Sequence, residues 1–337
     1  MYCGYVLEKG TAKMKKLYQR LPFIQFNKIR SCKVMKKRSK RKKSKLSSKS
    51  GFIKHCESIN APICFSLVNN TVETQIFFKT VLAGLNKKEI HINLKQVTQI
   101  SIETVLYLVT IMAHSGSCKI YGNAPEKKDI KKIFLDSGFY KYVVSTYRHN
   151  ETSEFISIKV GTFVQSEIAG EVIQFARDKL LLNNKKLTRD IYTTIMELMI
   201  NVKEHASRNE KLQEWWLVAY HNDDKNCISF AILDCGRGIP TTIKRKFRDL
   251  FYLSDSLLLK STLLGEKRSE TNLPYRGKGL PKIYEYALEN KVKNLYIMSN
   301  KGFFSSEDSG KCKDLDIPFK GTLVCWDFIP EVRYENY

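Results

Sequence analysis

The chain has 337 residues and a formal net charge of +23, from 57 Lys and Arg against 34 Asp and Glu. An apolar share of 43% is enough to build the cores of two ordinary domains. The nine cysteines are scattered without a C-x-x-C pair or zinc-type spacing, which argues against a disulfide scaffold or a zinc site and fits a reducing compartment. No apolar run approaches the roughly 18 residues of a membrane span and no secretory signal is evident, so we expect a cytoplasmic protein.

The positive charge is concentrated in residues 1–50, which hold 17 Lys and Arg against one acidic residue, Glu8. Ten of these basic residues lie between Lys33 and Lys49. Such a block repels itself and stays solvated, so we expect a disordered tail. It could dock on nucleic acid or an anionic surface, or it could only keep the chain soluble. No aromatic residue interrupts the basic run, which argues against base stacking by it.

Residues 51–146 alternate strand and helix patterns, which predict an α/β domain. Ser101 stands directly before a strongly apolar helix and is predicted to be its N-cap. The polar residues 147–154 are predicted to be a linker. The elements predicted in this part are a strand at Ala61–Val68, a helix at Val72–Leu85, a strand at Glu89–Leu94, a helix at Ile102–Ala113, a strand at Cys118–Tyr121 and a helix at Glu126–Leu135.

Residues 155–330 predict a second α/β domain in which strands and helices again alternate. Thr188 is predicted to cap the longest helix of this part. The expected elements are the strand Phe155–Val160, the helix Ser166–Leu181, the helix after Thr188, the hairpin strands Trp215–Tyr220 and Cys227–Leu233, a helix from Gly277 to Glu289, and the strands Asn294–Ser299 and Thr322–Phe328.

The helix after Thr188 carries a polar face whose side chains are of types that bind ligands or metal ions. Glu197, Asn201 and His205 recur every four residues, so they lie along one side of the helix. An apolar stripe runs beside them. A carboxylate, an amide and an imidazole on one face suit a nucleotide–Mg²⁺ site, although an amphipathic surface helix would show the same spacing.

Two glycine motifs follow this helix. Asp234 ends an apolar strand and is followed by Gly236 and Gly238, so a carboxylate acceptor lies next to backbone that a flat ring can approach closely. Gly277 and Gly279 open a helix, whose exposed N–H groups favour an anion. Arg276 and Lys278 add positive charge there. Each motif alone is weak, but the order of helix, Asp-x-Gly-x-Gly, basic insert and Gly-x-Gly is specific.

These motifs resemble those of the GHKL superfamily of ATPases and kinases over residues 155–330. The resemblance implies a Bergerat-type α/β sandwich with a mixed sheet, binding ATP and Mg²⁺. It implies that Glu197 is catalytic, that Asn201 is the Mg²⁺ ligand, and that Asp234 accepts the adenine amino group. It also implies that residues Ile239–Arg276 form a mobile lid over the phosphates. The residues that would bind the cofactor are Asn201, His205, Asp234, Gly236, Gly238, Ile239, Arg276, Gly277, Lys278, Gly279, Leu280 and Thr322.

Residues 51–146 resemble a STAS domain, the module of anti-sigma-factor antagonists, in the stretch Ile90–Ser101 and in Lys119–Gly122. The acidic residue that often precedes the phosphorylated serine of that family is absent, because Ile100 stands before Ser101. We therefore do not expect the phosphoswitch of that family, and modification of Ser101 or Thr104 stays open. Together the two resemblances imply a signalling protein in which a STAS-like domain is fused to a GHKL domain of the anti-sigma-factor serine-kinase type.

The sequence leaves three functions open. The first is a Ser/Thr protein kinase or slow ATPase, in which Glu197 activates a hydroxyl or water. The second is a nucleotide-dependent switch that binds protein partners without significant catalysis; a STAS-like or sigma-factor-like regulator, or a second copy of the chain, is the expected partner. The third is a regulator bound to nucleic acid through Lys33–Lys49, for which deleting that run would flatten the salt dependence of binding.

Overall fold

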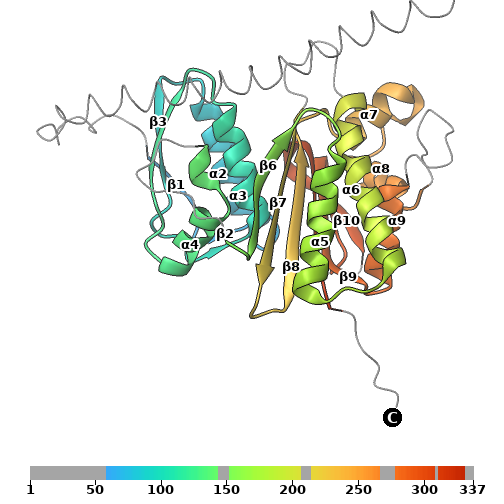
Figure 1. The fold of residues 1–337 in the computed structure, drawn as a ribbon. Coiled ribbons are helices and arrows are strands. Elements are labelled where there is room, and N and C mark those ends of the chain that lie inside the picture. The colour runs from blue at the N-terminus through green and yellow to red at the C-terminus, as the bar shows by residue number, and fades with distance from the viewer. Residues whose placement is uncertain (1–57, 143–151, 206–213, 266–277, 308–309, 331–337) are drawn as a thin grey trace, which may run out of the picture. The chain divides into compact units, whose positions relative to one another are not determined.

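The computed structural model describes residues 58–142, 152–205, 214–265, 278–307 and 310–330 (Figure 1). For residues 202–205 only the helical backbone is described. The basic tail, the predicted linker from 147 to 151, and the motif residues Arg276 and Gly277 lie outside these ranges. The described fold is a mixture of α-helices and β-sheets, as predicted, and residues from Glu57 onward form one unit.

The first part of the described chain contains two small parallel sheets. One has the order β1-β3-β5, and the other pairs β2 with β4. The strand predicted at Ala61–Val68 is reduced to the two residues of β2, because the next residues turn into a helix. The elements are β1 (Ser58–Asn60), β2 (Cys64–Phe65), α2 (Thr71–Gly84), β3 (Glu89–Asn93), β4 (Gln99–Ile100), α3 (Ile102–Ala113), β5 (Lys119–Asn123), α4 (Lys128–Asp136) and the 3-10 helix η1 (Phe139–Lys141).

The second part is built on a five-stranded sheet with the order β6-β7-β8-β10-β9. Every neighbouring pair in this sheet is antiparallel, so the mixed sheet expected for residues 155–330 is wrong. The reason is that β7–β8 and β9–β10 are both hairpins, and β10 then pairs antiparallel with β8. The strands are β6 (Phe155–Gly161), β7 (Trp215–Asn222), β8 (Cys227–Asp234), β9 (Val292–Ser305) and β10 (Lys311–Phe328).

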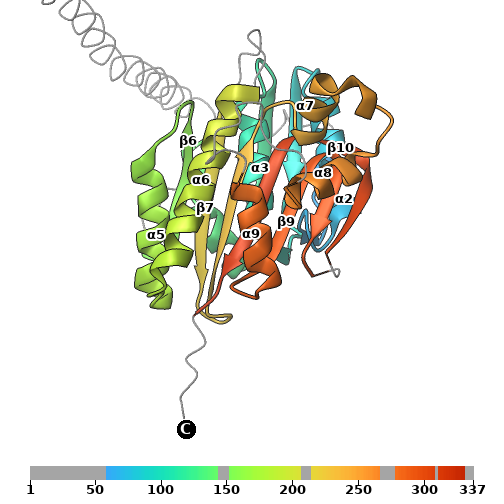
Figure 2. The same ribbon diagram turned by 90° about the vertical axis from the view of Figure 1, so that its right-hand side faces the viewer.

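Three helices cover one face of this sheet: α5 (Ser166–Leu180), α6 (Lys185–His205) and α9 (Gly279–Leu288) (Figure 2). The first turn of α6 is capped by Asn184, whose Oδ1 accepts the Leu187 N–H at 2.9 Å. The prediction that Thr188 is the cap is therefore wrong; its hydroxyl donates back to the Asn184 carbonyl at 3.0 Å. The basic insert between the two glycine motifs contains α7 (Ile239–Lys246), the 3-10 helix η2 (Arg248–Leu250) and α8 (Asp255–Leu263).

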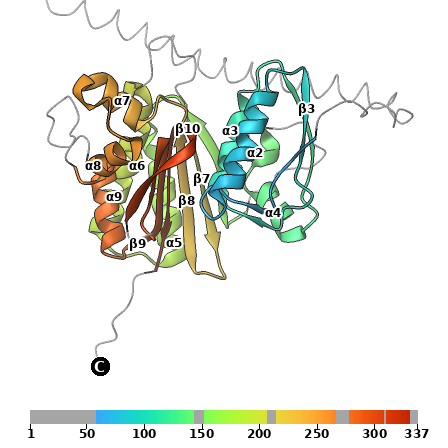
Figure 3. The same ribbon diagram turned by 180° about the vertical axis from the view of Figure 1, so that it is seen from behind.

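The five-stranded sheet is buried on both faces, and its sequence shows why. Trp215 and Leu217 point toward α5, α6 and α9, whereas Trp216 and Val218 belong to the core on the opposite face. Helix α3 packs on that opposite face against β7 and β8 (Figure 3). Strands covered on both sides read as continuous apolar runs, which is what the hairpin β7–β8 shows.

The start of α3 differs from the prediction in one detail. Ser101 does occupy the N-cap position, but its side chain makes no capping bond to the helix. Its hydroxyl instead bonds the Ser66 hydroxyl at 2.9 Å and the carboxyl of Glu103. Burial raises the pKa of Glu103 to about 7, so this carboxyl can hold a proton in the hydroxyl cluster near neutral pH.

None of the helices in the described ranges is both long enough and apolar enough to span a membrane.

Candidate functional site

The candidate site is centred on Asp234, the last residue of β8. Its neighbours in register are Trp215 on β7 and Thr322 on β10. One carboxyl oxygen accepts the Gly236 N–H at 2.7 Å, which turns the chain sharply after the strand. Gly321 permits the close approach of β10, because a Cβ there would lie 1.9 Å from the Asp234 carbonyl oxygen and its φ is +91°.

The electrostatic state of Asp234 is set by burial and by hydrogen bonds. Burial raises its pKa to about 6, while donation from Gly236 and from the hydroxyl and N–H of Thr322 opposes that rise. The adjacent Cys235 thiol stays neutral, because burial raises its pKa to about 12. Near neutral pH, the site therefore offers a carboxylate acceptor for a hydrogen-bond donor.

The loop after Asp234 is held by two residues of β9 that the sequence did not single out. Ser299 Oγ accepts the Ile239 N–H at 2.8 Å. The Asn300 side chain accepts from Thr241 N at 3.1 Å and donates to the Arg237 carbonyl at 2.8 Å. These bonds satisfy the first N–H groups of α7, so its N-terminus is already capped by neutral side chains.

Gly238 is the position where this loop needs glycine. Its φ is +85°, and an added Cβ would lie 2.5 Å from the Asn300 amide oxygen. The sequence predicted that Gly236 and Gly238 let the backbone approach a flat ring closely, and this stays a prediction; of the two, only Gly238 has a positive φ. No pattern in the sequence marked Ser299 and Asn300, the strand residues that bind this loop.

The second glycine motif lies against α6. Glu197 Oε2 accepts the Gly279 N–H at 2.8 Å and the Lys278 N–H at 3.1 Å. Thr194, one turn earlier on α6, lies with its hydroxyl 3.4 Å from the Gly279 carbonyl. The structure therefore brings together Glu197 and the second glycine motif, 82 residues apart in the chain. The N–H groups expected to hold an anion are bound by a carboxylate of the protein itself.

The remaining predicted residues fall into three groups. Asn201 lies one turn after Glu197 and is partly buried. Lys278, between the two glycines of the second motif, is exposed. Leu280 and Thr322 are buried, at 7% exposure each. The side chain of His205, with all of Arg276 and Gly277, lies outside the described residues.

The segment expected to form the lid is helical where it is described. Ile239 begins α7, and Lys244 on that helix pairs with Asp255 at the start of α8, with 2.7 Å between Nζ and Oδ1. Arg245, Lys246 and Arg248 are exposed. Residues 266–276 of the expected lid lie outside the described ranges.

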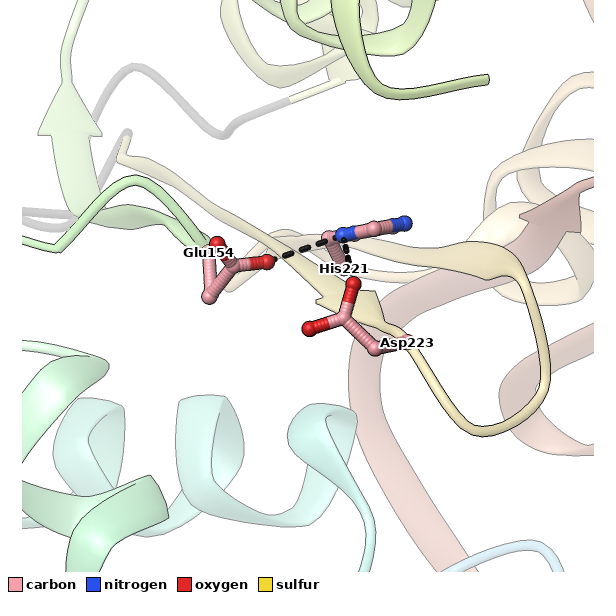
Figure 4. Close-up of side chains that lie close together, drawn as sticks. All are labelled: Glu154, His221 and Asp223. Carbon is pink, nitrogen blue, oxygen red and sulfur yellow. Dashed lines mark hydrogen bonds and ion pairs between the residues drawn. The ribbon is translucent and has the colours of Figure 1, made fainter.

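A separate cluster of chemical groups lies near the far end of β7, remote from Asp234 along the strand. Nδ1 of the buried His221 lies 2.8 Å from a Glu154 oxygen and 3.0 Å from an Asp223 oxygen (Figure 4). Lys179 pairs with the other Glu154 oxygen at 2.7 Å. Burial acts to raise the Glu154 pKa, but hydrogen bonds from Lys179 and His221 lower it to about 2.

The donor atoms of Glu154, His221 and Asp223 lie within 4.8 Å of one another, which is a spacing that a metal ion can use. Lys179 already pairs with Glu154, and both carboxylates contact the same nitrogen of His221, Nδ1. These two features favour a structural role over metal binding. We interpret the cluster as a set of ion pairs that fastens the start of β6 to the end of β7.

Sequence comparison gives no independent indication of family. No protein-family model matches the chain, and no curated protein is significantly similar to it. The interpretation of the site therefore depends on its residues and their geometry.

Proposed function

We propose that the chain binds Mg·ATP at the Asp234 site and acts in signalling as a Ser/Thr protein kinase or slow ATPase of the GHKL type. The observation that carries the proposal is the convergence of separate motifs. Asp234 is bonded by Gly236 and Thr322, and Glu197 is bonded by Gly279. Four stretches that were recognised separately in the sequence thus meet in two bonded pairs.

The proposed roles follow from the donors and acceptors present. Asp234, ionised above its pKa of about 6, would accept the amino group of adenine. Asn201 would hold Mg²⁺ through its amide oxygen, and the metal would offset the charge of the phosphates. The exposed Lys278 would add a cation beside them.

Glu197 already accepts two backbone hydrogen bonds, and this limits how it can act. Its carboxylate uses the Lys278 and Gly279 N–H groups, which the phosphates would need. Two anions cannot share these donors, so phosphate binding would displace Glu197. The displaced carboxylate could then take a proton from an acceptor hydroxyl or from water.

A second candidate function follows from the same contact. Displacement of Glu197 removes a bond between α6 and α9, so nucleotide could change the surface of the protein without turnover. Turnover by the wild type separates the two functions. An enzyme releases or transfers the γ-phosphate, and Glu197→Ala abolishes this step while still binding ATP. Nucleotide-dependent partner binding by a wild type that neither releases nor transfers phosphate would exclude the enzyme and favour the switch.

A further inference from the structure

Ser299 on β9 lies at the centre of a buried chain of hydrogen bonds. Its side chain is 0% exposed. Its Oγ accepts the Ile239 N–H at 2.8 Å and lies 3.1 Å from Thr322 Oγ1. The Gly321 carbonyl lies 3.2 Å away and is a second acceptor for the Ser299 proton. Ser299 therefore contacts both the first turn of α7 and the strand that carries Thr322.

The chemistry of the end groups gives this chain a direction. The Ile239 N–H can only donate, and the ionised Asp234 carboxylate can only accept. The Thr322 hydroxyl donates to Asp234, so its oxygen remains free to accept from Ser299. The single Ser299 proton has two acceptors, the Gly321 carbonyl and Thr322 Oγ1. When it is donated to Thr322, the bonds run from Ile239 through Ser299 and Thr322 to Asp234. In such a chain each bond polarises the next, so loss of one weakens the others.

Asn300 provides an internal comparison, because it caps the same helix without joining this chain. Its amide oxygen accepts from the N–H and hydroxyl of Thr241, and its amide nitrogen donates to the Arg237 carbonyl. The two neighbouring residues thus both hold the N-terminus of α7. The hydrogen bonds of Ser299, but not those of Asn300, lead on through Thr322 to Asp234.

We propose that Ser299 is a positioning residue that couples the N-terminus of α7 to the base-binding carboxylate of Asp234. The proposal rests on the proposed function for the role of Asp234. When α7 is seated, Ser299 is held by Ile239 and supports the Thr322–Asp234 bond. When the first turn of α7 opens, that support weakens. The N-terminus of α7 and the carboxylate of Asp234 therefore change together.

The titration of Asp234 reports this coupling, because its pKa depends on the Thr322 bond. Among the described residues, burial, the Gly236 N–H, and the hydroxyl and N–H of Thr322 set that pKa. The adjacent Cys235 thiol remains neutral across the range, with a pKa of about 12. A weaker Thr322 bond raises the Asp234 pKa above about 6.

The test uses the full ligand-free chain with ¹³C-labelled aspartate carboxyls, and Asp234→Asn assigns the signal. Trypsin cleavage after Lys244 and Arg245 reports opening of α7. Ser299→Ala is expected to raise the Asp234 titration midpoint by about 0.5 and to speed cleavage about tenfold. The control Asn300→Ala is expected to speed cleavage while leaving the midpoint unchanged.

A reciprocal variant tests the chain from its other end. Thr322→Val removes the hydrogen bond to Asp234 without changing any residue of α7. If the two sites are coupled, trypsin should nevertheless cleave α7 faster in this variant. This variant also decides the matter if Ser299→Ala fails to fold. The proposal is overturned if Ser299→Ala speeds cleavage without moving the midpoint, or if Thr322→Val leaves cleavage unchanged. Failure of wild type to bind ADP would contradict the proposed function alone, since neither readout needs a ligand.

Discussion

Helices α7 and α9 both begin beside a glycine motif, yet their first turns are capped in opposite ways. The N–H groups of α7 are bound by Ser299 and Asn300, which are neutral and come from the sheet. Those of α9 are bound by the carboxylate of Glu197, which comes from a neighbouring helix. The first N–H groups of both helices have acceptors, but only those of α9 are bound by a charged group.

The difference separates a helix end whose cap belongs to the fold from one whose cap an incoming anion can replace. A neutral cap contributed by a strand is part of the fold, and an incoming anion gains little by replacing it. A carboxylate cap marks a place where negative charge is already stabilised by the helix, so another anion can take that place. Under the proposed function, base recognition would belong to the α7 side of the site and phosphate exchange to the α9 side.

The largest effect should come from alanine at Gly238, and Gly279 provides the comparison. Gly238→Ala should lower the free energy of unfolding by about 3 kcal/mol, because φ is +85° and the new Cβ meets Asn300 at 2.5 Å. Gly279→Ala should cost about 1 kcal/mol, since its Cβ lies 3.1 Å from Glu197. Urea unfolding followed by circular dichroism measures both. Equal losses would contradict the distinction between the two helix ends.

The next effect concerns pH and Asp234. Its folded pKa of about 6 lies above the ordinary value of 3.8, so the folded state binds the proton more tightly than the unfolded chain. The contribution of Asp234 to stability is thus fully present below about pH 4 and is lost as pH rises through 6. Relative to Asp234→Asn, wild type should gain about 2 kcal/mol between pH 7.5 and 4.5 in urea titrations. A constant difference between the two proteins would contradict the pKa assigned here.

A smaller effect is expected from neutralising the charged cap. Glu197→Gln should bind ADP about tenfold more tightly, because the like charge that opposes the phosphates is gone. Adenosine, which carries no phosphate, should bind both proteins equally, and calorimetric titration measures the pair. Weaker ADP binding by the variant would exclude competition between Glu197 and phosphate.

The smallest effects should come from ion pairs near the two helices. Lys244→Met breaks the partly buried pair with Asp255 and should cost about 1 kcal/mol. Lys282→Met breaks an exposed pair with Glu285 on α9 and should change stability by less than about 0.5 kcal/mol. Thermal unfolding in low and high salt checks both. A larger loss for Lys282→Met would mean that α9 is held by surface charge.

Much of the fold could be predicted from local patterns. Helix α3 was predicted with its exact bounds, and α2 and α5 to within a residue or so, because apolar spacing and turn residues mark them. Strand β10 was missed from Lys311 to Gly321, where charged residues interrupt the apolar alternation. The antiparallel sheet could not be predicted, since pairing depends on contacts distant in sequence.

The candidate site was predictable to a similar degree. Local sequence patterns mark Asp234, the glycines after it and the helix with Glu197. Glycines allow backbone conformations that other residues rarely adopt, and a four-residue spacing places side chains on one face of a helix. Ser299 and Asn300 carry none, because a serine and an asparagine in a strand are ordinary until the fold brings a helix end against them. The capping of Gly279 by Glu197 also needed the structure, since it joins residues 82 positions apart.

The central claim is that Asp234 belongs to an adenine-nucleotide site. Calorimetric titration of the full chain with ADP and a non-hydrolysable ATP analogue, with and without Mg²⁺, tests it most directly. We predict micromolar, Mg²⁺-dependent binding to wild type that Asp234→Asn abolishes while remaining folded. Absence of binding to wild type, or equal binding by Asp234→Asn, would contradict the account.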